Sequence, residues 1–443
     1  MLPEKFKQRM KTLLKEDYEA FIASYDEPPK KSFFINTNKI SEQDFLTLCD
    51  FKIEKRAFGY RLLEDIKIGK TPEHHAGMIY MQELSAMMPV DFLPLNNGDV
   101  VLDLCASPGG KSIQVANKLQ NGFLVSNEIV KSRAFVLQSN IERMGLTNVC
   151  VTNNSPNELE KLFQGMFDAL VVDAPCSGEG MFRKEEQAWL NWSQENVEAC
   201  AIRQLAILES ANNMLKNNGY LLYSTCTFSV EEDEMVIAKF CEKHNYEILP
   251  LNYEGAIHGE RVLNCDTDKT LRFYPHKFDG EGQFVALLQK KENSINRIEQ
   301  KKILNDLSKC KFEYNIFNDF CKANLYNYED IINNAIINNR IIYYTKNKAI
   351  AKSGVNLVNC GVVLGEIVKD RFEPNHNLFT CFGKRFKKII NLTKQEIEKF
   401  LNGETINYDI DGDVAVSFNG VIVGFGKGSQ GIIKNHYPKK LRN

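Results

Sequence analysis

Two cysteines in this 443-residue chain lie in polar turns that each follow an apolar run. Cys176 lies in D-A-P-C-S-G after the run A-L-V-V, and Cys226 lies in Y-S-T-C-T after the run Y-L-L-Y. Asp173 begins the first of these turns. A single cysteine is most often a small buried hydrophobic residue. Two thiols and a carboxylate at the ends of neighbouring strands form a rarer combination, which indicates covalent catalysis by a thiolate.

A thiolate beside a carboxyl group suits the methylation of carbon 5 in a pyrimidine. That carbon is a poor nucleophile, but a thiolate added at carbon 6 gives an enamine-like adduct whose carbon 5 can attack a methyl donor. An acid that holds the N3 proton of the ring would stabilise the adduct, and Asp173 is placed for this role. The Pro-Cys dipeptide favours Cys176 as the attacking thiol, but the residues alone leave the choice between Cys176 and Cys226 open.

A Gly-rich turn follows the run V-V-L-D and precedes a helix. The turn consists of Cys105, Ala106, Ser107, Pro108, Gly109, Gly110 and Lys111. A triphosphate-binding P-loop would need glycine where Cys105 stands, and the dinucleotide pattern G-x-G-x-x-G is absent. We therefore favour a site for an adenosine cofactor without a diphosphate. Glu128 ends the next strand, where a carboxylate can bind the two ribose hydroxyls. The alternative is an ordinary turn with a surface glutamate.

Alternating strands and helices position these loops. The pattern predicts strands at 100–103, 121–127, 148–152, 167–173, 219–224, 246–249 and 283–289, and helices at 82–93, 130–144, 157–163, 196–214 and 230–244. This alternation is typical of an α/β protein with a doubly wound parallel sheet. Because the carboxyl ends of parallel strands meet at one edge, the Gly-rich turn and both cysteine turns should line one pocket.

Different patterns flank this region. Residues 1–75 read as a small α+β domain, 76–290 as the α/β domain, 291–306 as a polar linker and 307–443 as a mostly β region. In the last region we expect helices near 314–323 and 328–338 and a hairpin with its turn at Asn419-Gly420. Two basic clusters are candidate phosphate contacts or merely solvated faces. They are Lys384, Arg385, Lys387 and Lys388, and Lys434, Lys439, Lys440 and Arg442.

Composition and charge indicate where the protein is expected to act, but they do not indicate which reaction it catalyses. A formal net charge of -2 neither requires nor excludes a nucleic-acid partner, because a basic patch can exist within a neutral total. The 12 cysteines form no C-x-x-C pair and no cluster with zinc spacing, so we expect no metal ion. The charged N-terminus lacks a signal-peptide core, and no apolar run is long enough to span a membrane. We therefore expect a cytoplasmic protein without a membrane partner.

Taken together, the motifs resemble the Nop/Sun family of RNA (cytosine-5)-methyltransferases. The matching segments are M-Q-E-L-S-A-M (81–87), D-L-C-A-S-P-G-G-K-S (103–112), E-x4-R-x3-L-x2-N-x2-R-x-G (128–145), V-D-A-P-C-S-G-E-G-M-F-R-K (172–184), Y-S-T-C-T-F (223–228) and R-F-Y-P-H (272–276). The M-F-R-K segment and the ending K-N-H-Y-P-K-K-L-R are similar to the RsmF-like bacterial branch. That branch carries a PUA-like RNA-binding region, here expected at about 360–443.

The resemblance implies a class I, Rossmann-like methyltransferase domain that uses S-adenosyl-L-methionine, with an RNA-binding region on either side. It assigns nucleophilic attack to Cys226 of the T-C motif and product release to Cys176. Carbon 5 of cytosine in RNA is then the methylated atom, with the 16S rRNA of the small ribosomal subunit as the expected substrate. Transfer RNA is an alternative substrate. A third hypothesis, an rRNA assembly factor with a vestigial pocket, predicts loss of a thiol or of the Gly-rich turn, and both are retained.

The family resemblance also implies the cofactor-binding residues. These would be the Cys105–Lys111 turn, Glu128 and Asp173, with Arg133 of the E-x4-R motif as a further contact. Many relatives have an acid after the third strand to bind adenine, but this chain has Ser155 at the matching position. Adenine would then be bound by Ser155 or by the backbone.

Overall fold

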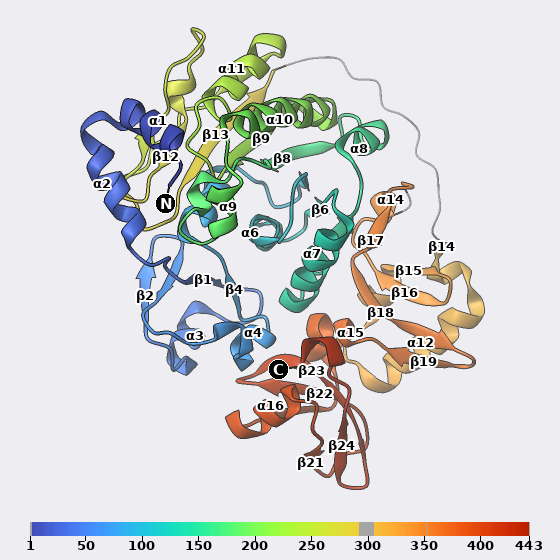
Figure 1. Ribbon diagram of the computed structural model, residues 1–443. Helices are drawn as coiled ribbons and strands as arrows, with labels where there is room; N and C mark the ends of the chain where they lie inside the picture. The colour runs from blue at the N-terminus through green and yellow to red at the C-terminus, as the bar shows by residue number, and fades with distance from the viewer. Residues whose placement is uncertain (1, 292–304, 352, 443) are drawn as a thin grey trace.

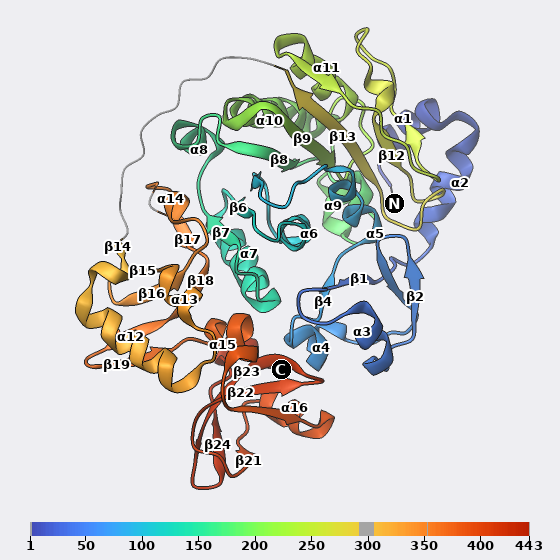
Figure 2. The ribbon, with the colours of Figure 1, turned by 180° about the vertical axis from the view of Figure 1, so that it is seen from behind.

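The computed structural model describes residues 2–291, 305–351 and 353–442. Figure 1 shows an N-terminal part in blue, a central sheet with its helices in cyan to yellow, and a C-terminal part in orange and red. The view from behind in Figure 2 shows the same three parts around the end of α7. The expected linker at 291–306 falls almost entirely outside the described residues.

The N-terminal part contains a four-stranded antiparallel sheet with the order β2-β3-β1-β4. Its elements are α1 (Glu4–Leu14), α2 (Tyr18–Ala23), β1 (Ser32–Ile35), α3 (Glu42–Leu48), β2 (Ile53–Arg56), β3 (Gly59–Leu62), α4 (Pro72–His75) and β4 (Ile79–Met81). Because β4 pairs with β1, the expected boundary at residue 75 is too early, and this sheet ends at Met81. Three residues are too few for a periodic pattern to reveal a strand.

The central sheet has the parallel order β7-β6-β5-β8-β9, and β13 runs antiparallel beside β9. Its strands are β5 (Val100–Asp103), β6 (Phe123–Asn127), β7 (Val149–Thr152), β8 (Phe167–Asp173), β9 (Leu215–Thr225) and β13 (Gln283–Lys290). This confirms the doubly wound α/β fold. The order reverses between β5 and β8, so the crevice above their carboxyl ends is the expected binding position.

Helices cover both faces of this sheet. They are α6 (Gly110–Lys118) and α7 (Lys131–Met144) on one face, and α8 (Pro156–Leu162), α10 (Gln194–Met214) and α11 (Glu234–Lys243) on the other. Successive strand residues point to opposite faces, so Val101 packs in the first hydrophobic cluster and Leu102 in the second. The continuous apolar runs of these strands follow from this double burial.

The expected helix at 82–93 is wrong in extent. The chain instead forms α5 (Leu84–Met87) and a 3₁₀ turn at Pro89–Phe92. Proline lacks the N–H that a continuing α-helix would need, which explains the early end. A further short helix, α9 (Glu186–Leu190), lies in the long loop after β8.

Strands from outside the parallel core extend the central sheet at both edges. Beyond β9, β13 pairs with β10 (Tyr246–Ile248) and β12 (Leu271–Phe273), which pairs with β11 (Ile257–His258). At the opposite edge, β17 (Leu357–Asn359) of the C-terminal part runs antiparallel to β7. The C-terminal part is therefore joined to the central sheet by backbone pairing. No helix within the described residues is long and apolar enough to cross a membrane.

The C-terminal part contains two five-stranded sheets. The first comprises β14 (Asn305–Asp306), β15 (Ala335–Asn338), β16 (Ile341–Tyr344), β18 (Val362–Val368) and β19 (Arg371–Pro374), with α12 (Lys311–Asn324), α13 (Glu329–Asn333), α14 (Lys348–Ala351) and α15 (His376–Phe382). The second comprises β20 (Ile389–Leu392), β21 (Ile406–Asn407), β22 (Gly412–Phe418), β23 (Val421–Ser429) and β24 (Ile432–Asn435), with α16 (Lys394–Leu401).

Two turns in the C-terminal part explain which secondary-structure predictions were correct there. The hairpin at Asn419-Gly420 is confirmed, because β22 and β23 pair on either side of it and both turn residues have positive φ. The expected helix at 328–338 is wrong, since α13 ends at residue 333 and β15 begins at residue 335. Asn339 and Arg340 also have positive φ and form a two-residue turn between β15 and β16. Such a turn fixes a hairpin where the isoleucines alone suit either structure.

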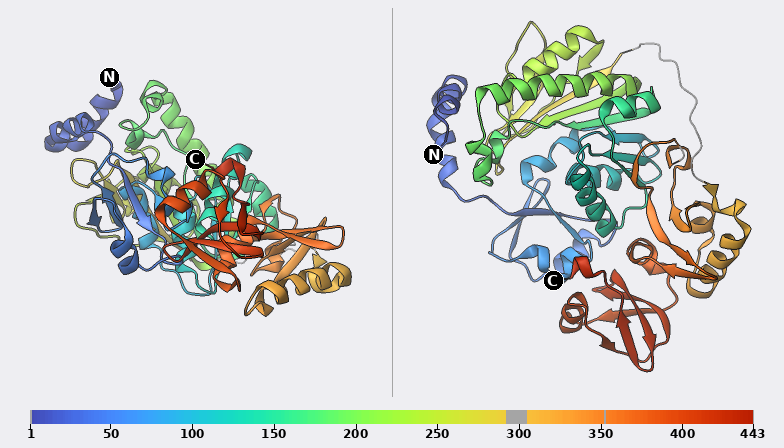
Figure 3. Two further views of the ribbon diagram at one scale, coloured as in Figure 1. Left: turned by 90° about the horizontal axis from the view of Figure 1, so that it is seen from below. Right: turned by 45° about the vertical axis from the view of Figure 1, so that its right-hand side comes forward.

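The two ends of the chain share one hydrophobic core. Phe33 and Ile79 of the N-terminal sheet cluster with Ile390 and Val416 of the last sheet. The turned view in Figure 3 shows these two parts next to each other, with the C-terminus between them. The N-terminal, central and C-terminal parts therefore form a closed arrangement around the end of α7.

Candidate active site

The two cysteine turns meet because β8 and β9 are parallel neighbours. Asp173 at the end of β8 aligns with Ser224 near the end of β9, so both chains leave the sheet side by side. The Sγ atoms of Cys176 and Cys226 lie 3.3 Å apart, and both residues are partly exposed. The structure thus brings together the two thiols that the sequence placed above one pocket.

The surroundings of Cys176 raise the pKa of its thiol. The hydrogen bond with Cys226 and burial raise the pKa of Cys176 well above its ordinary value, and the nearby Glu232 carboxylate adds to this effect. Cys176 therefore keeps its proton at neutral pH and can donate a hydrogen bond to the sulfur of Cys226.

Asp173 connects the cysteine turns to the Gly-rich turn. Its Oδ2 lies 2.9 Å from Nζ of Lys111, a buried lysine in the first turn of α6. Its Oδ1 accepts hydrogen bonds from Ser224 Oγ at 2.7 Å and from Gln283 Nε2 at 3.4 Å. These contacts hold a partly exposed carboxylate at the rim of the crevice.

The Gly-rich turn is braced by the backbone and by α7. Ala106 N–H donates to Asn127 O of β6, and the Ser107-Pro108 peptide bond is cis. Ser107 exchanges two hydrogen bonds with Arg133, one through its Oγ and one through its carbonyl oxygen. Gly109 has a φ of 117°, which favours glycine. A Cβ on Gly110 would lie 2.6 Å from the Gln82 side chain. The backbone of the turn thus favours glycine at position 109, and a side chain at position 110 would have to displace Gln82.

Two residues of this turn region have raised pKa values. Burial raises the pKa of Cys105, so that thiol stays neutral. Burial also raises the pKa of Asp103, at the end of β5, to about 7, although Ser112 Oγ donates to it at 2.7 Å. Asp103 was not among the residues predicted from the sequence. The signals for it were an acid at the end of an apolar strand and its position in D-L-C-A-S-P-G-G-K-S.

Glu128 lies at the end of β6, buried beside the same crevice. Its Oε1 accepts from Val130 N–H at 2.8 Å, and its Oε2 lies 3.7 Å from Arg133 Nη2. Ser155 is the N-cap of α8, where it forms a capping box with Glu158. Its side chain therefore already serves the start of a helix.

A buried carboxylate, Glu232, connects the two cysteine turns from below. Its Oε1 accepts from Ser177 N–H at 2.8 Å, and its Oε2 accepts from Ser177 Oγ at 2.5 Å and from Thr227 Oγ1 at 3.4 Å. Ser177 and Thr227 directly follow Cys176 and Cys226. Burial raises the pKa of Glu232 to about 7. This residue fixes both turns, and the sequence indicated only that it lies near the start of the helix expected at 230–244.

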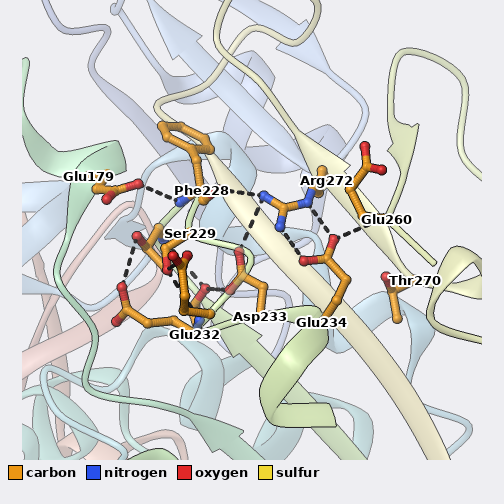
Figure 4. A network of polar contacts seen from close by, with 12 residues as sticks. Glu179, Phe228, Ser229, Glu232, Asp233, Glu234, Glu260, Thr270 and Arg272 are labelled. Atoms are coloured by element: carbon orange, nitrogen blue, oxygen red, sulfur yellow. Dashed lines mark hydrogen bonds and ion pairs between the residues drawn. The ribbon is translucent and has the colours of Figure 1, made fainter. Parts of the chain in front are cut away.

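Figure 4 shows the larger network to which Glu232 belongs. Glu179 accepts from Phe228 N–H at 3.0 Å and forms an ion pair with Arg9 of α1, so the N-terminal helix is tied to the turn after Cys226. Arg272 of β12 donates from Nε to Glu234 Oε1 at 2.6 Å and from Nη1 to Phe228 O at 2.9 Å. The side chains of Glu179, Glu234 and Arg272 are buried, and that of Arg9 is 18% exposed. The signal for Arg272 was its position in R-F-Y-P-H.

The described residues contain no group of three or more His, Cys, Asp or Glu side chains arranged to hold a metal ion. The polar groups at the carboxyl ends of the strands are instead carboxylates, hydroxyls and backbone groups around a glycine turn. Such a set suits an organic cofactor with hydroxyl and amine groups.

Comparison with known proteins gives matches along nearly the whole chain. Residues 2–84 match the N-terminal domain of 16S rRNA methyltransferase RsmF, residues 90–289 match 16S rRNA methyltransferase RsmB/F, and residues 387–443 match the RsmF PUA domain. The last match is shorter than the expected PUA-like span of 360–443.

Curated relatives and solved structures agree with these matches. "Ribosomal RNA small subunit methyltransferase F" of Vibrio campbellii is 32% identical over 99% of this chain and 97% of the relative, and the Aeromonas salmonicida protein of the same name is 29% identical over 96% and 93%. A methyltransferase homologue from Pyrococcus horikoshii is 28% identical, with a TM-score of 0.58 over 65% of this chain and 95% of its own.

A structure of NSun6 from Pyrococcus horikoshii with SFG, an S-adenosylmethionine analogue, shares the fold. It has a TM-score of 0.57 and 21% identity over 66% of this chain and 99% of its own. The full-length identity to curated relatives and the three matched domains agree with the paired thiols above a class I methyltransferase sheet. The chain is therefore a methyltransferase that belongs to the ribosomal RNA small subunit methyltransferase F family.

Proposed function

We propose that the protein methylates carbon 5 of cytosine in 16S rRNA through a covalent adduct on Cys226. The observation that carries this proposal is the 3.3 Å contact between the sulfur atoms of Cys226 and Cys176 at the carboxyl ends of β8 and β9. The reaction needs two thiols if one bonds to the base and the other assists its release. The names of the relatives support rRNA as the substrate.

The residues at the ends of β5 and β6 fit S-adenosylmethionine. Glu128 has one backbone N–H donor and a distant arginine, so its carboxylate can still accept two ribose hydroxyls. We assign the cofactor to the Cys105–Lys111 turn, Glu128 and Asp173, with Arg133 bracing Glu128. Ser155 stays a prediction, since its hydroxyl also caps α8. When bound, the cofactor supplies an electrophilic methyl group.

Asp173, Cys226 and Cys176 have separate roles in the formation and breakdown of the adduct. Addition of the Cys226 thiolate to carbon 6 moves negative charge to N3 of the ring, where a proton shared with Asp173 would neutralise it. After methylation, carbon 5 loses its proton to water, the bond between carbon 6 and sulfur breaks, and Cys226 leaves as a thiolate. Cys176 stays protonated and donates a hydrogen bond to the departing sulfur, in keeping with its raised pKa.

Replacement of each thiol separates these roles. Cys226→Ala should abolish methylation, because it removes the thiol that the proposal assigns to the adduct. Cys176→Ala should still form the adduct but accumulate it as a protein–RNA band that survives denaturation. Cys310→Ala, in the C-terminal part, is the matched control and should behave as the wild type. Full methylation by the Cys226→Ala variant would refute the assignment of the nucleophile.

Bisulfite sequencing of total RNA from cells with and without the protein identifies the substrate. A 5-methylcytosine that disappears from 16S rRNA supports the proposal, and one that disappears only from transfer RNA overturns it. With ribosomal RNA as the proposed substrate, we also expect the enzyme to act in the cytoplasm. The matched PUA domain supports RNA binding by the C-terminal part.

A further inference from the structure

A pocket of about 360 Å³ lies where the three parts of the molecule meet. The N-terminal part contributes Lys39, the central domain contributes Gly145 just after α7, and the C-terminal part contributes Lys346, Lys384 and Arg385. Figures 1 and 2 show the three parts around the end of α7, with α15 beside it. We call this cavity the interdomain pocket.

The interdomain pocket has an excess of positive charge. Among its lining residues, four are cationic and only Asp330 is anionic. Asp330 forms an ion pair with Arg385. In the part of the chain that the structure describes, no carboxylate lies within ion-pair distance of Lys39, Lys346 or Lys384.

Lys39 is the deepest of these cations. It is 8% exposed, and its Nζ donates to the carbonyl oxygen of Thr380. A Cβ on Gly145 would lie 2.6 Å from Nζ, so the ammonium group rests against the backbone just after α7. Burial, with a smaller contribution from the nearby Lys384, lowers the pKa of Lys39 to about 8. A neighbouring anion would offset the cost of burying this charge.

The structure divides the basic cluster at 384–388 into two pairs. Lys384 and Arg385 line the interdomain pocket. Lys387 and Lys388 lie outside it: Lys387 donates to Lys322 O at 2.7 Å, and Lys388 donates to Asp411 O. One turn thus supplies two cations to the pocket and two adjacent cations that serve as a matched control.

The pocket lies near the amino end of β7, whereas the proposed active site lies at the carboxyl ends of β8 and β9. α7 begins beside Glu128 and ends at the pocket after 14 residues, a length of about 21 Å. A small ligand cannot contact both places, but a polyanionic strand can. The chemistry of the pocket, with several N–H donors and positive charge, suits a phosphate group.

We propose that the interdomain pocket binds a backbone phosphate of the RNA substrate, held by Lys39, Lys346 and Lys384. This proposal rests on the proposed function, because it takes RNA to be the substrate. A phosphate in the pocket would contact the N-terminal and C-terminal parts at once. It would therefore position the RNA across the molecule without reading its sequence.

The test compares two double variants of the full-length protein. Lys346→Gln/Lys384→Gln removes two pocket cations, and Lys387→Gln/Lys388→Gln removes two adjacent cations outside the pocket. Binding of a 16S rRNA fragment is measured by fluorescence anisotropy between 50 and 200 mM KCl. For the pocket variant we expect a Kd about fivefold higher or more and a salt slope smaller by roughly 0.7, the value for one lost phosphate contact. Its kcat at saturating RNA should stay within about twofold of the wild type.

Equal Kd values and salt slopes for the wild type and the pocket variant would overturn the proposal. An equal loss of RNA affinity in both double variants would do so as well. It would indicate that binding depends on the overall positive charge of this surface and not on the pocket. Inorganic phosphate forms the second arm. If it raises the melting temperature of the wild type but not of the pocket variant, while RNA affinity is unchanged, the site takes a free anion and not RNA. A wild-type protein that binds RNA in the pocket but methylates none would refute the proposed function alone.

Discussion

The molecule contains two clusters of charged side chains that differ in how the charge is compensated. Beneath the cysteine turns, Glu232 accepts from Ser177, and Glu234 is paired with Arg272. In the interdomain pocket, Lys39 has a carbonyl oxygen as its acceptor and no carboxylate nearby in the described residues. This difference indicates two separate roles for charged groups. Groups that are paired within the chain fix its geometry, whereas cations left without a counterion are available to a ligand.

Replacement of Arg272 by methionine should have the largest effect. The substitution leaves Glu234 buried without its partner, a change that costs about 3–5 kcal/mol of unfolding free energy. Urea denaturation of Arg272→Met measures the loss. Arg261→Met, at an exposed arginine that pairs with Asp266, is the control and should change stability by less than about 1 kcal/mol. A loss of similar size in both variants would show that the acidic network does not depend on its own counterion.

The pKa of Lys39 predicts a stability effect on the alkaline side. The folded-state pKa of about 8 lies below the ordinary value of 10.5. Between these two values the unfolded chain holds a proton that the folded protein has released, so stability should rise with pH across this window. The gain is of the order of 3 kcal/mol at most. Thermal unfolding from pH 7.5 to 10.5 should show this rise in the wild type and a flatter profile in Lys39→Met. Identical profiles would contradict the burial of an uncompensated charge.

Replacement of Glu232 by glutamine tests whether the paired cluster positions the thiols. The amide cannot accept all the hydrogen bonds that Ser177 and Thr227 now donate, so the two turns should loosen. We expect kcat to fall about tenfold, equivalent to roughly 1.4 kcal/mol, with little change in the KM for S-adenosylmethionine. Glu231→Gln is the matched control because it changes the neighbouring carboxylate. Equal kcat values for Glu232→Gln and the control would remove Glu232 from the positioning of the thiols.

Strand order explains why the sequence predicted much of the site. Cys176, Cys226 and Asp173 were placed together because the carboxyl ends of adjacent parallel strands share an edge, a relation that follows from the alternation of strands and helices. The Gly-rich turn and Glu128 were found in the same way. These positions depend on local patterns and on one topological rule, and both can be recognised in a single amino-acid sequence.

Long-range partners were not predicted because no local pattern encodes them. Arg9 and Glu179 are 170 residues apart, and Lys39 meets the backbone of Thr380 across 341 residues. The helix expected at 328–338 failed for a related reason. Its isoleucines suit either structure, and the turn at Asn339-Arg340 decides for a hairpin. Hydrophobic periodicity therefore predicts neither the contacts between domains nor the structures that turn residues determine.

The pairing of β17 with β7 has a consequence for the synthesis of the protein. Without β17, the outer edge of β7 would present free N–H and C=O groups, a template on which another chain can add a strand and aggregate. Leu357 and Asn359 cover that edge with residues encoded more than 200 positions later than β7. While the chain is being made, the sheet therefore stays open at one side until this segment leaves the ribosome. The C-terminal part then closes the edge and protects the enzyme from self-association.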